Sequence, residues 1–119
     1  MPISRIILYA HDAEATVRFY ETHFGFRASH AAGDRIVELI PEGGGASLMI
    51  HPASKGQKCG QSLVKLVFDV RDVVAFCDRS AVAGLVFGSI HHADGYQFAN
   101  VKDPSGNPIS VSSRAFRNA

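Results

Sequence analysis

Residues 12–26 read Asp-Ala-Glu-Ala-Thr-Val-Arg-Phe-Tyr-Glu-Thr-His-Phe-Gly-Phe, and this stretch decides the fold. The carboxylate of Asp12 can accept a hydrogen bond from an amide of the first helical turn, and Glu14 places negative charge at the positive end of the helix dipole. Gly25 can adopt the left-handed conformation that ends a helix. Apolar side chains recur every three or four residues, at Ala13, Val17, Tyr20 and Phe24. The stretch therefore predicts a helix whose apolar stripe lies on a sheet.

A second stretch, residues 72–85, repeats this pattern with different side chains. It opens with Asp72 and closes with a Gly-Leu pair, as the first opens with Asp12 and closes with Gly-Phe. The two Asp residues lie 60 positions apart, and Gly25 and Gly84 lie 59 apart. A constant offset between a start signal and a stop signal indicates an internal repeat.

Each helix is expected to sit among four strands. Strands are predicted over residues 3–11, 26–30, 35–40, 46–51, 62–71, 86–91, 96–102 and 108–112. We therefore expect one α+β domain over residues 1–119, in which two βαβββ modules form a curved mixed sheet with the helices on its outer face. Module one spans 1–53, a connector 54–61, module two 62–113 and a tail 114–119. The chain from Ser113 onward is expected to be mobile.

Composition excludes several classes of protein. The chain has 119 residues, 46% of them hydrophobic, and a formal net charge of +1 with the charges scattered. Without a basic stripe we expect no nucleic-acid partner, and without a long apolar run we expect no membrane partner. The first residues lack the order of a signal peptide, so a cytoplasmic location is expected.

Three features together resemble the vicinal oxygen chelate superfamily, which includes glyoxalase I, bleomycin and fosfomycin resistance proteins, and extradiol dioxygenases. They are Phe19-Tyr20 followed by Gly25-Phe26, the doubled βαβββ pattern, and the segment 103–107, Asp-Pro-Ser-Gly-Asn, before the last strand. The resemblance implies paired modules, commonly in a homodimer with two ligand cups. It does not imply one reaction, because a single fold supports many chemistries.

The resemblance also implies four metal-ligand positions, which here fall on Arg5, Met49, Lys65 and Ser110. Arg and Lys have no acceptor at neutral pH, a thioether is soft, and a lone hydroxyl is a poor ligand. We therefore expect no metal, no cofactor and no catalytic residue of the metal-dependent kind. A shift in strand register leaves one other ligand set open, namely His11, His51, Glu38 and Asp69.

The cup is expected to bind a ligand instead. Its predicted residues are Arg5, Tyr9, Met49, His51, Lys65, Tyr96, Phe98, Asn100 and Ser110. In the seventh strand the inward set comes from the family's register, and strand alternation alone also permits Gln97, Ala99 and Val101. The charges of Arg5 and Lys65 must be met by Glu38 and Asp69 or by an anionic ligand.

The expected function is metal-independent binding of a small amphipathic or aromatic molecule, which can be anionic, in the cup of a homodimer. This resembles a bleomycin-resistance protein that sequesters its ligand. One alternative is a metal-dependent lyase, isomerase or dioxygenase of the glyoxalase type, which requires ligands at the four substituted positions. A second alternative is a dimeric scaffold that binds no ligand.

Overall fold

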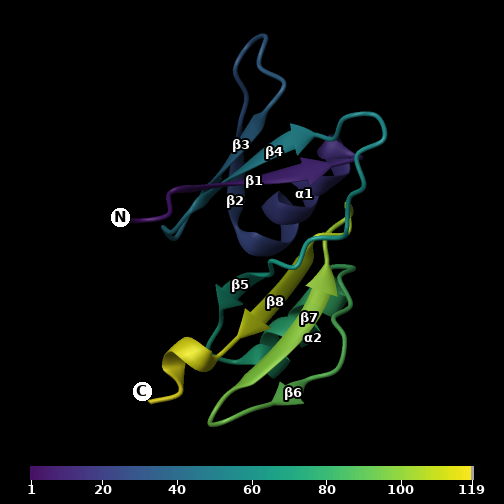
Figure 1. The fold of residues 1–119 in the computed structure, drawn as a ribbon. Helices are drawn as coiled ribbons and strands as arrows, with labels where there is room; N and C mark the ends of the chain where they lie inside the picture. The colour runs from purple at the N-terminus through teal and green to yellow at the C-terminus, as the bar shows by residue number, and fades with distance from the viewer. Residues whose placement is uncertain (119) are drawn as a thin grey trace. The chain divides into compact units, whose positions relative to one another are not determined.

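The chain contains two successive groups of strands, and each group forms its own sheet and carries one α-helix. The structure is a computed structural model and describes residues 1–118. These residues divide into two units: the first holds residues 1–61 with 103–107, and the second holds 62–102 with 108 onward. Figure 1 shows that each unit consists of one sheet and one long helix. The predicted α+β class with two βαβββ modules is confirmed.

The first unit contains a four-stranded mixed sheet in the order β1-β4-β3-β2. Its elements are β1 (Arg5–Ala10), α1 (Ala13–Phe24), β2 (Phe26–Ser29), β3 (Val37–Pro41) and β4 (Ser47–Pro52). Strand β1 pairs in parallel with β4, while β3 is antiparallel to both β4 and β2. The parallel pair is possible because α1 and the β2-β3 hairpin connect its two strands.

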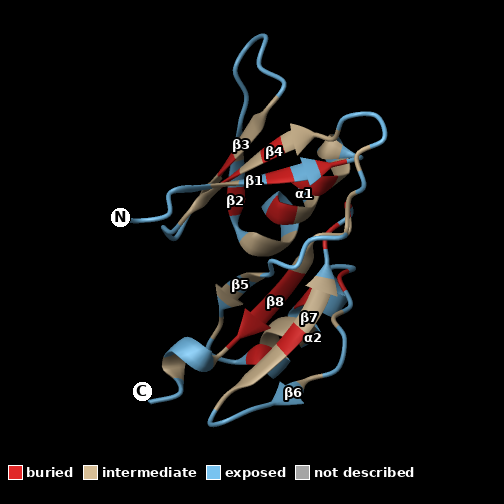
Figure 2. Cartoon of the chain, in the orientation of Figure 1, coloured by how far each residue is buried: buried red, intermediate tan, exposed pale blue. Residues whose placement is uncertain are grey.

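Helix α1 begins and ends where the sequence signals predict. Asp12 Oδ1 accepts a 3.0 Å hydrogen bond from the Ala15 amide. Gly25 has a φ of 69°, in the left-handed region, and its amide bonds the Tyr20 carbonyl. Thr16, Val17 and Tyr20 are the buried residues of the helix. They form the predicted contact with the sheet, whose buried side chains are Leu8, Ala10, Phe26, Leu39, Leu48 and Ile50 (Figure 2).

The second unit repeats the topology with the order β5-β8-β7-β6. Its elements are β5 (Leu66–Asp69), α2 (Val73–Val82), β6 (His91–His92), β7 (Gln97–Lys102) and β8 (Pro108–Ser112). Two strand predictions are too long. Residues 62–65 and 86–90 carry apolar side chains but join no ladder, and Leu63 and Val86 are exposed. The apolar residues there predict strands, but these segments form no strand ladder with the sheet.

Helix α2 also starts at its predicted cap, because Asp72 Oδ1 accepts a 3.0 Å hydrogen bond from the Ala75 amide. Ala83 is the C-cap, and Gly84 follows it with a φ of 95°. The Leu85 amide then bonds the Ser80 carbonyl at 2.8 Å. The start and stop signals of the repeat therefore operate in both units.

The Asp-Pro-Ser-Gly-Asn segment forms the predicted turn and packs in the first unit. Asp103 Oδ1 accepts from the amides of Ser105 and Asn107, both at 2.9 Å. The Ser105 hydroxyl lies 2.9 Å from that of Thr16 in α1. This turn is therefore a structural part of the first unit, although β7 and β8 on either side belong to the second.

The tail is the main correction to the predicted organisation. Residues Arg114–Phe116 form a short 3-10 helix, and Ser113 exchanges hydrogen bonds with Gln97. The tail therefore contains a helical turn that the sequence does not predict, and Ala119 lies outside the described residues. No helix of residues 1–118 has the length and apolar character needed to cross a bilayer.

Candidate ligand-binding faces

The first candidate surface is the face of the first sheet that α1 does not cover, here called the first open face. In β1, Leu8 and Ala10 are buried toward the helix, whereas Ile7 and Tyr9 are 47% and 43% exposed. Strand alternation places the following residues on this face: Arg5, Ile7, Tyr9, Glu38, Met49 and His51. The register supports this, because Ile7 pairs with Met49, Tyr9 with His51 and Glu38 with Met49.

Arg5 lies beside a carboxylate on this face. Its Nε donates to Glu38 Oε1 at 3.3 Å, and the two side chains are 60% and 35% exposed. The internal pairing predicted for Arg5 is therefore present. An exposed pair of this kind stabilises a protein by only about 0.2–1 kcal/mol. The guanidinium group can consequently still contact a ligand.

Tyr9 and His51 form the aromatic part of the first open face. Their ring centroids are 5.2 Å apart and the rings are tilted by 50°. His51 Nδ1 lies 2.8 Å from the carbonyl oxygen of Pro52, which can only accept. Nδ1 must therefore carry a proton, so in the neutral ring Nε2 is an acceptor. The face thus offers two stacking rings and one hydrogen-bond acceptor.

The second open face is the corresponding side of the second sheet, opposite α2. Phe98 pairs with Ser112 and Asn100 with Ser110, while Ala99 between them is fully buried. Phe98 and Asn100 therefore share one face of β7, and Ala99 lies buried on the opposite face. Ser110 is itself 3% exposed, so it offers a ligand little surface.

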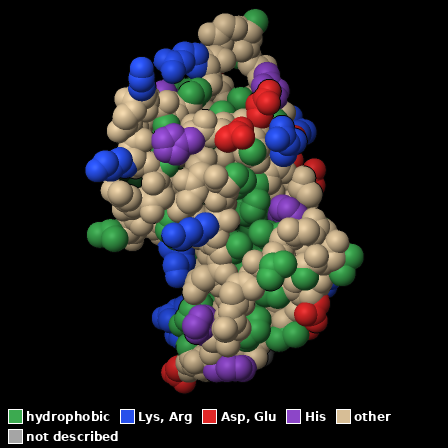
Figure 3. All heavy atoms as spheres, turned by 90° about the vertical axis from the view of Figure 1, so that its right-hand side faces the viewer, with side chains coloured by type: hydrophobic (Ala, Val, Ile, Leu, Met, Phe, Trp, Pro, Cys, Tyr) green, Lys and Arg blue, Asp and Glu red, His purple; other side chains and the backbone are tan. Residues whose placement is uncertain are grey.

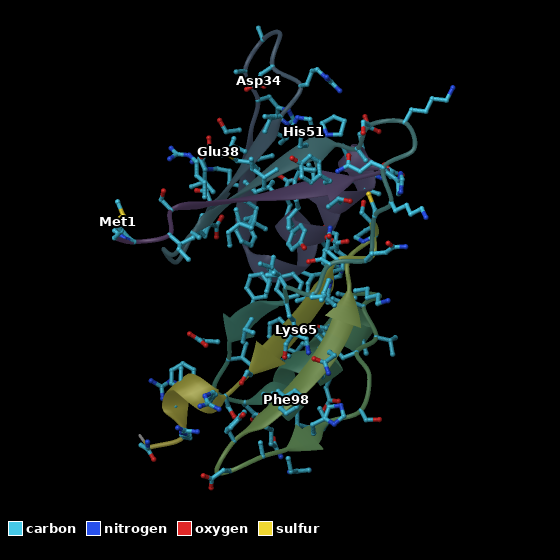
Figure 4. All side chains as sticks on the ribbon, viewed as in Figure 1. Met1, Asp34, Glu38, His51, Lys65 and Phe98 are labelled. Atoms are coloured by element: carbon cyan, nitrogen blue, oxygen red, sulfur yellow. The ribbon has the colours of Figure 1, made fainter. Side chains whose placement is uncertain are left out.

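Lys65 does not pair with the predicted carboxylate. Its Nζ donates to Asn100 Oδ1 at 2.9 Å, and the residue is exposed (Figure 4). The expected partner, Asp69, forms no ion pair with it among residues 1–118. Because an amide oxygen is neutral, the hydrogen bond leaves the ammonium charge uncompensated.

Aromatic rings extend across the second open face. His91 stacks on Phe98 with a centroid distance of 4.9 Å and an interplanar angle of 21°. The ring centroid of Tyr96 lies 6.2 Å from that of Phe98. His92 instead contacts Gln97, which confirms that the two adjacent histidines point to opposite faces. We call His91, Phe98 and Tyr96 the aromatic strip.

Two arginines beside this strip were missed in the sequence. The guanidinium carbons of Arg114 and Arg117 lie 5.3 Å and 5.8 Å from the centroid of Tyr96. The signal was present, because the two residues are three positions apart and lie on one side of a single helical turn. That spacing alone does not show which ring the two side chains contact.

The residues present do not form a metal site of the expected kind. Arg5 and Met49 lie on the first open face, and Lys65 and Ser110 lie on the second, where none offers a normal ligand atom for a divalent cation. No three His, Cys, Asp or Glu side chains of residues 1–118 are grouped to hold a metal ion. The register-shifted set therefore fails for its three members in the first unit, His11, His51 and Glu38.

Comparison with known proteins identifies the family. Residues 3–111 match the model of the Glyoxalase/Bleomycin resistance protein/Dioxygenase superfamily. The chain belongs to this superfamily. The resemblance seen in the sequence is therefore confirmed, and the superfamily accounts for the repeated βαβββ unit. A search of curated proteins gave no match.

Solved structures of the superfamily share the fold at low sequence identity. TnmS3, an antibiotic binding protein from Streptomyces sp. CB03234, is 22% identical with a TM-score of 0.76, over 93% of each chain. Lactoylglutathione lyase from Agrobacterium tumefaciens is 19% identical with a TM-score of 0.75, over 98% of this chain and 96% of that one. A superfamily member from Sphaerobacter thermophilus is 18% identical with a TM-score of 0.75, over 94% and 96%. These likenesses show the fold alone.

Proposed function

We propose that this protein binds a small amphipathic or aromatic molecule without a metal ion, on the open faces of its sheets, and does so as a homodimer. The proposal is supported by the side chains of Arg5, Met49, Lys65 and Ser110, which the family resemblance implies stand at the metal-ligand positions of related enzymes. Two of these side chains are cations, so they attract an anionic ligand group and repel a divalent metal.

The exposed chemistry supports a ligand with both an apolar and an anionic part. Ile7 and Tyr9 on the first open face leave nearly half of their surface in water. Figure 3 shows one side of the molecule, where hydrophobic side chains are exposed between separate Lys and Arg side chains. Apolar surface beside a few fixed polar groups is typical of small-molecule sites.

The related structures do not decide between binding and catalysis, so the choice depends on the side chains of this protein. TnmS3 is described as an antibiotic binding protein and the Agrobacterium protein as a lyase, so both activities exist on this fold. Metal-dependent isomerisation needs an ion that polarises the substrate oxygens. The side chains of Arg5 and Lys65 cannot hold such an ion, which ranks the binding function first.

A homodimer is proposed because each open face leaves large apolar side chains exposed. Ile7, Tyr9 and Val67 each expose more than two fifths of their surface. Exposed apolar side chains on an uncovered sheet face can mark a binding or association surface. Most soluble homo-oligomers are twofold dimers, so a second copy is the simplest partner.

Thermal-shift measurements with aromatic carboxylates, sulfonates and neutral planar molecules test the binding function. A ligand present at about 100 times its Kd stabilises the native state by about 2.7 kcal/mol, which raises Tm by several degrees. Arg5→Ala and Lys65→Ala should reduce the shift that an anionic ligand produces. Arg18→Ala, an exposed arginine on α1, and Lys55→Ala in the connector are the matched controls.

Three results would count against the proposal. Equal shifts in wild type and in the Arg5 and Lys65 variants would contradict the role of these cations. A complete lack of stabilisation by any compound would favour the scaffold alternative. Stoichiometric metal with turnover of a hemithioacetal would favour the enzyme.

A further inference from the structure

Tyr96 holds two guanidinium groups beside a single ring. Arg114 Nη1 donates a 3.0 Å hydrogen bond to the Tyr96 hydroxyl, and its guanidinium carbon lies 5.3 Å from the ring centroid. The guanidinium carbon of Arg117 lies 5.8 Å from the same centroid. The two side chains are exposed. Two positive charges therefore share one phenol ring at the end of the aromatic strip.

The backbone that carries these arginines is fixed by contacts within the second unit. The Ser113 amide donates to the Gln97 carbonyl, and the Gln97 amide donates to the Ser113 hydroxyl, both at 3.0 Å. The Ser112 hydroxyl accepts a 3.1 Å bond from the Arg114 amide. Phe116 lies under the guanidinium of Arg71, 4.3 Å from ring centroid to carbon. The cations are thus presented on an ordered turn, which reduces the entropy cost of binding.

Within residues 1–118, no ion pair compensates the positive charge of this turn. Among residues 1–118, neither Arg114 nor Arg117 forms an ion pair, and the neighbouring carboxylate of Asp69 forms none with them. Like charges held close together repel, and each guanidinium keeps donors that match the oxygens of a carboxylate, sulfonate or phosphate. Binding of one anion between them would offset that repulsion.

The aromatic strip leads directly to these cations. His91 stacks on Phe98, Phe98 lies 6.2 Å from Tyr96, and Tyr96 contacts Arg114. Figure 4 shows Phe98 on the β7 strand of the second sheet. We infer that Arg114 and Arg117 form an anion subsite for a planar aromatic acid, whose ring lies along Phe98 and Tyr96 and whose anionic group contacts the two guanidinium groups. This deepens the proposed function, because it rests on the second open face being a ligand surface and adds a second pair of cations, besides Arg5 and Lys65, that can contact the anionic group.

The test compares an aromatic anion with its neutral analogue. The probes are 2-naphthoate and 2-naphthamide, and binding is followed by calorimetry and by probe fluorescence, which is convenient because the chain has no Trp. Wild type should bind the naphthoate more tightly, and the double variant Arg114→Gln, Arg117→Gln should weaken it about tenfold or more while changing the naphthamide affinity less than about twofold. Higher salt should weaken only naphthoate binding.

Matched variants keep the test specific. Arg79→Gln removes the same charge from an exposed position on α2, on the other side of the sheet, and should leave both affinities unchanged. If the double variant unfolds the 3-10 turn at residues 114–116, the single variant Arg117→Gln replaces it in the test, because it keeps the hydrogen bond from Arg114 to Tyr96. Phe98→Leu should weaken both probes, since it shortens the stacking surface.

The outcomes separate this inference from the proposed function. Equal affinity of wild type for the two probes, unchanged naphthoate affinity in the double variant, or an equal loss in Arg79→Gln would overturn the anion subsite. If Arg5→Ala and Lys65→Ala alone weaken the naphthoate, the proposed function stands and the subsite is wrong. Failure of wild type to bind either probe would overturn the subsite, while stabilisation by other compounds in the thermal screen would still support the binding function.

Discussion

The hydroxyl of Tyr20 donates a 2.8 Å hydrogen bond to Oδ2 of Asp103, a residue 83 positions later in the chain. Both are buried, and Tyr20 is completely inaccessible to solvent. The same carboxylate accepts two backbone amides through Oδ1 and the Asn107 side-chain amide through Oδ2. With four donors, the buried charge is well solvated by the protein. The bond attaches the turn between β7 and β8 to the helix of the first unit.

Replacing Tyr20 with Phe should destabilise the protein by about 2 kcal/mol, because a buried hydrogen bond to a charged acceptor is lost. Urea unfolding measures the change. Tyr9→Phe is the matched control, since its ring is exposed and it should lose less than about 0.5 kcal/mol. In a double-mutant cycle with Asp103→Asn, the two effects should be less than additive. Strict additivity would mean that the two residues do not interact energetically.

Stability should fall at alkaline pH because of the same residue. Burial, and then the charge of Asp103, raise the pKa of the Tyr20 hydroxyl above its usual value of 10.0. Above pH 10 the unfolded chain therefore releases this proton while the native chain keeps it. The free energy of unfolding then falls by up to about 1.4 kcal/mol per pH unit. Urea unfolding between pH 9 and 11 should show this contribution in wild type, and a slope unchanged in Tyr20→Phe would contradict it.

Gly106 should tolerate no side chain. Its φ is 86°, and a Cβ built there would lie 3.0 Å from the Cα of Gly60. Gly106→Ala adds backbone strain and a contact that the backbone of residue 60 cannot easily relieve, so a loss of about 2–4 kcal/mol is expected. Gly44→Ala has a similar φ of 87° in open space. It should lose only the strain, about 1–2 kcal/mol, and equal losses would show that the contact with Gly60 has no effect.

Glu38→Gln should separate the two roles of Arg5, which are its ion pair with Glu38 and its proposed contact with an anionic ligand. If the cation serves an anionic ligand, removing the neighbouring carboxylate should strengthen binding of an aromatic anion by up to about fivefold and change stability by less than about 1 kcal/mol. Calorimetry with wild type and variant measures the affinity. Weaker binding in Glu38→Gln would show that the carboxylate itself contacts or positions the ligand.

The fold could be predicted because its signals are local. Asp12, Asp72 and Gly25 act on amides and dihedral angles within one turn of the chain, so their positions in the sequence suffice to place the helix ends. Helix α2 ends one residue earlier than Gly84, because its C-cap is Ala83. The equal spacing in the two halves then gave the repeat and its topology.

The contacts of the candidate site were harder to predict because they depend on distant partners. Lys65 could have met Asp69, four residues away, but it bonds Asn100 on β7, and β8 lies between β5 and β7 in the sheet. Arg114 and Arg117 both contact the ring of Tyr96. The hydrogen bond between Gln97 and Ser113 holds the two chain segments together. The spacing of Arg114 and Arg117 is compatible with one helical turn, but nothing in residues 113–118 indicates that Tyr96 lies beside them.

Metal analysis coupled to binding tests the central claim most directly. The purified protein is analysed for bound metal, and 2-naphthoate affinity is then measured after chelator treatment and after addition of zinc, nickel or manganese. We predict substoichiometric metal and the same affinity in all four conditions, because the proposed function needs no ion and the cations Arg5 and Lys65 cannot ligate one. One equivalent of metal per chain, with binding that disappears on chelation and returns with the ion, would contradict the account.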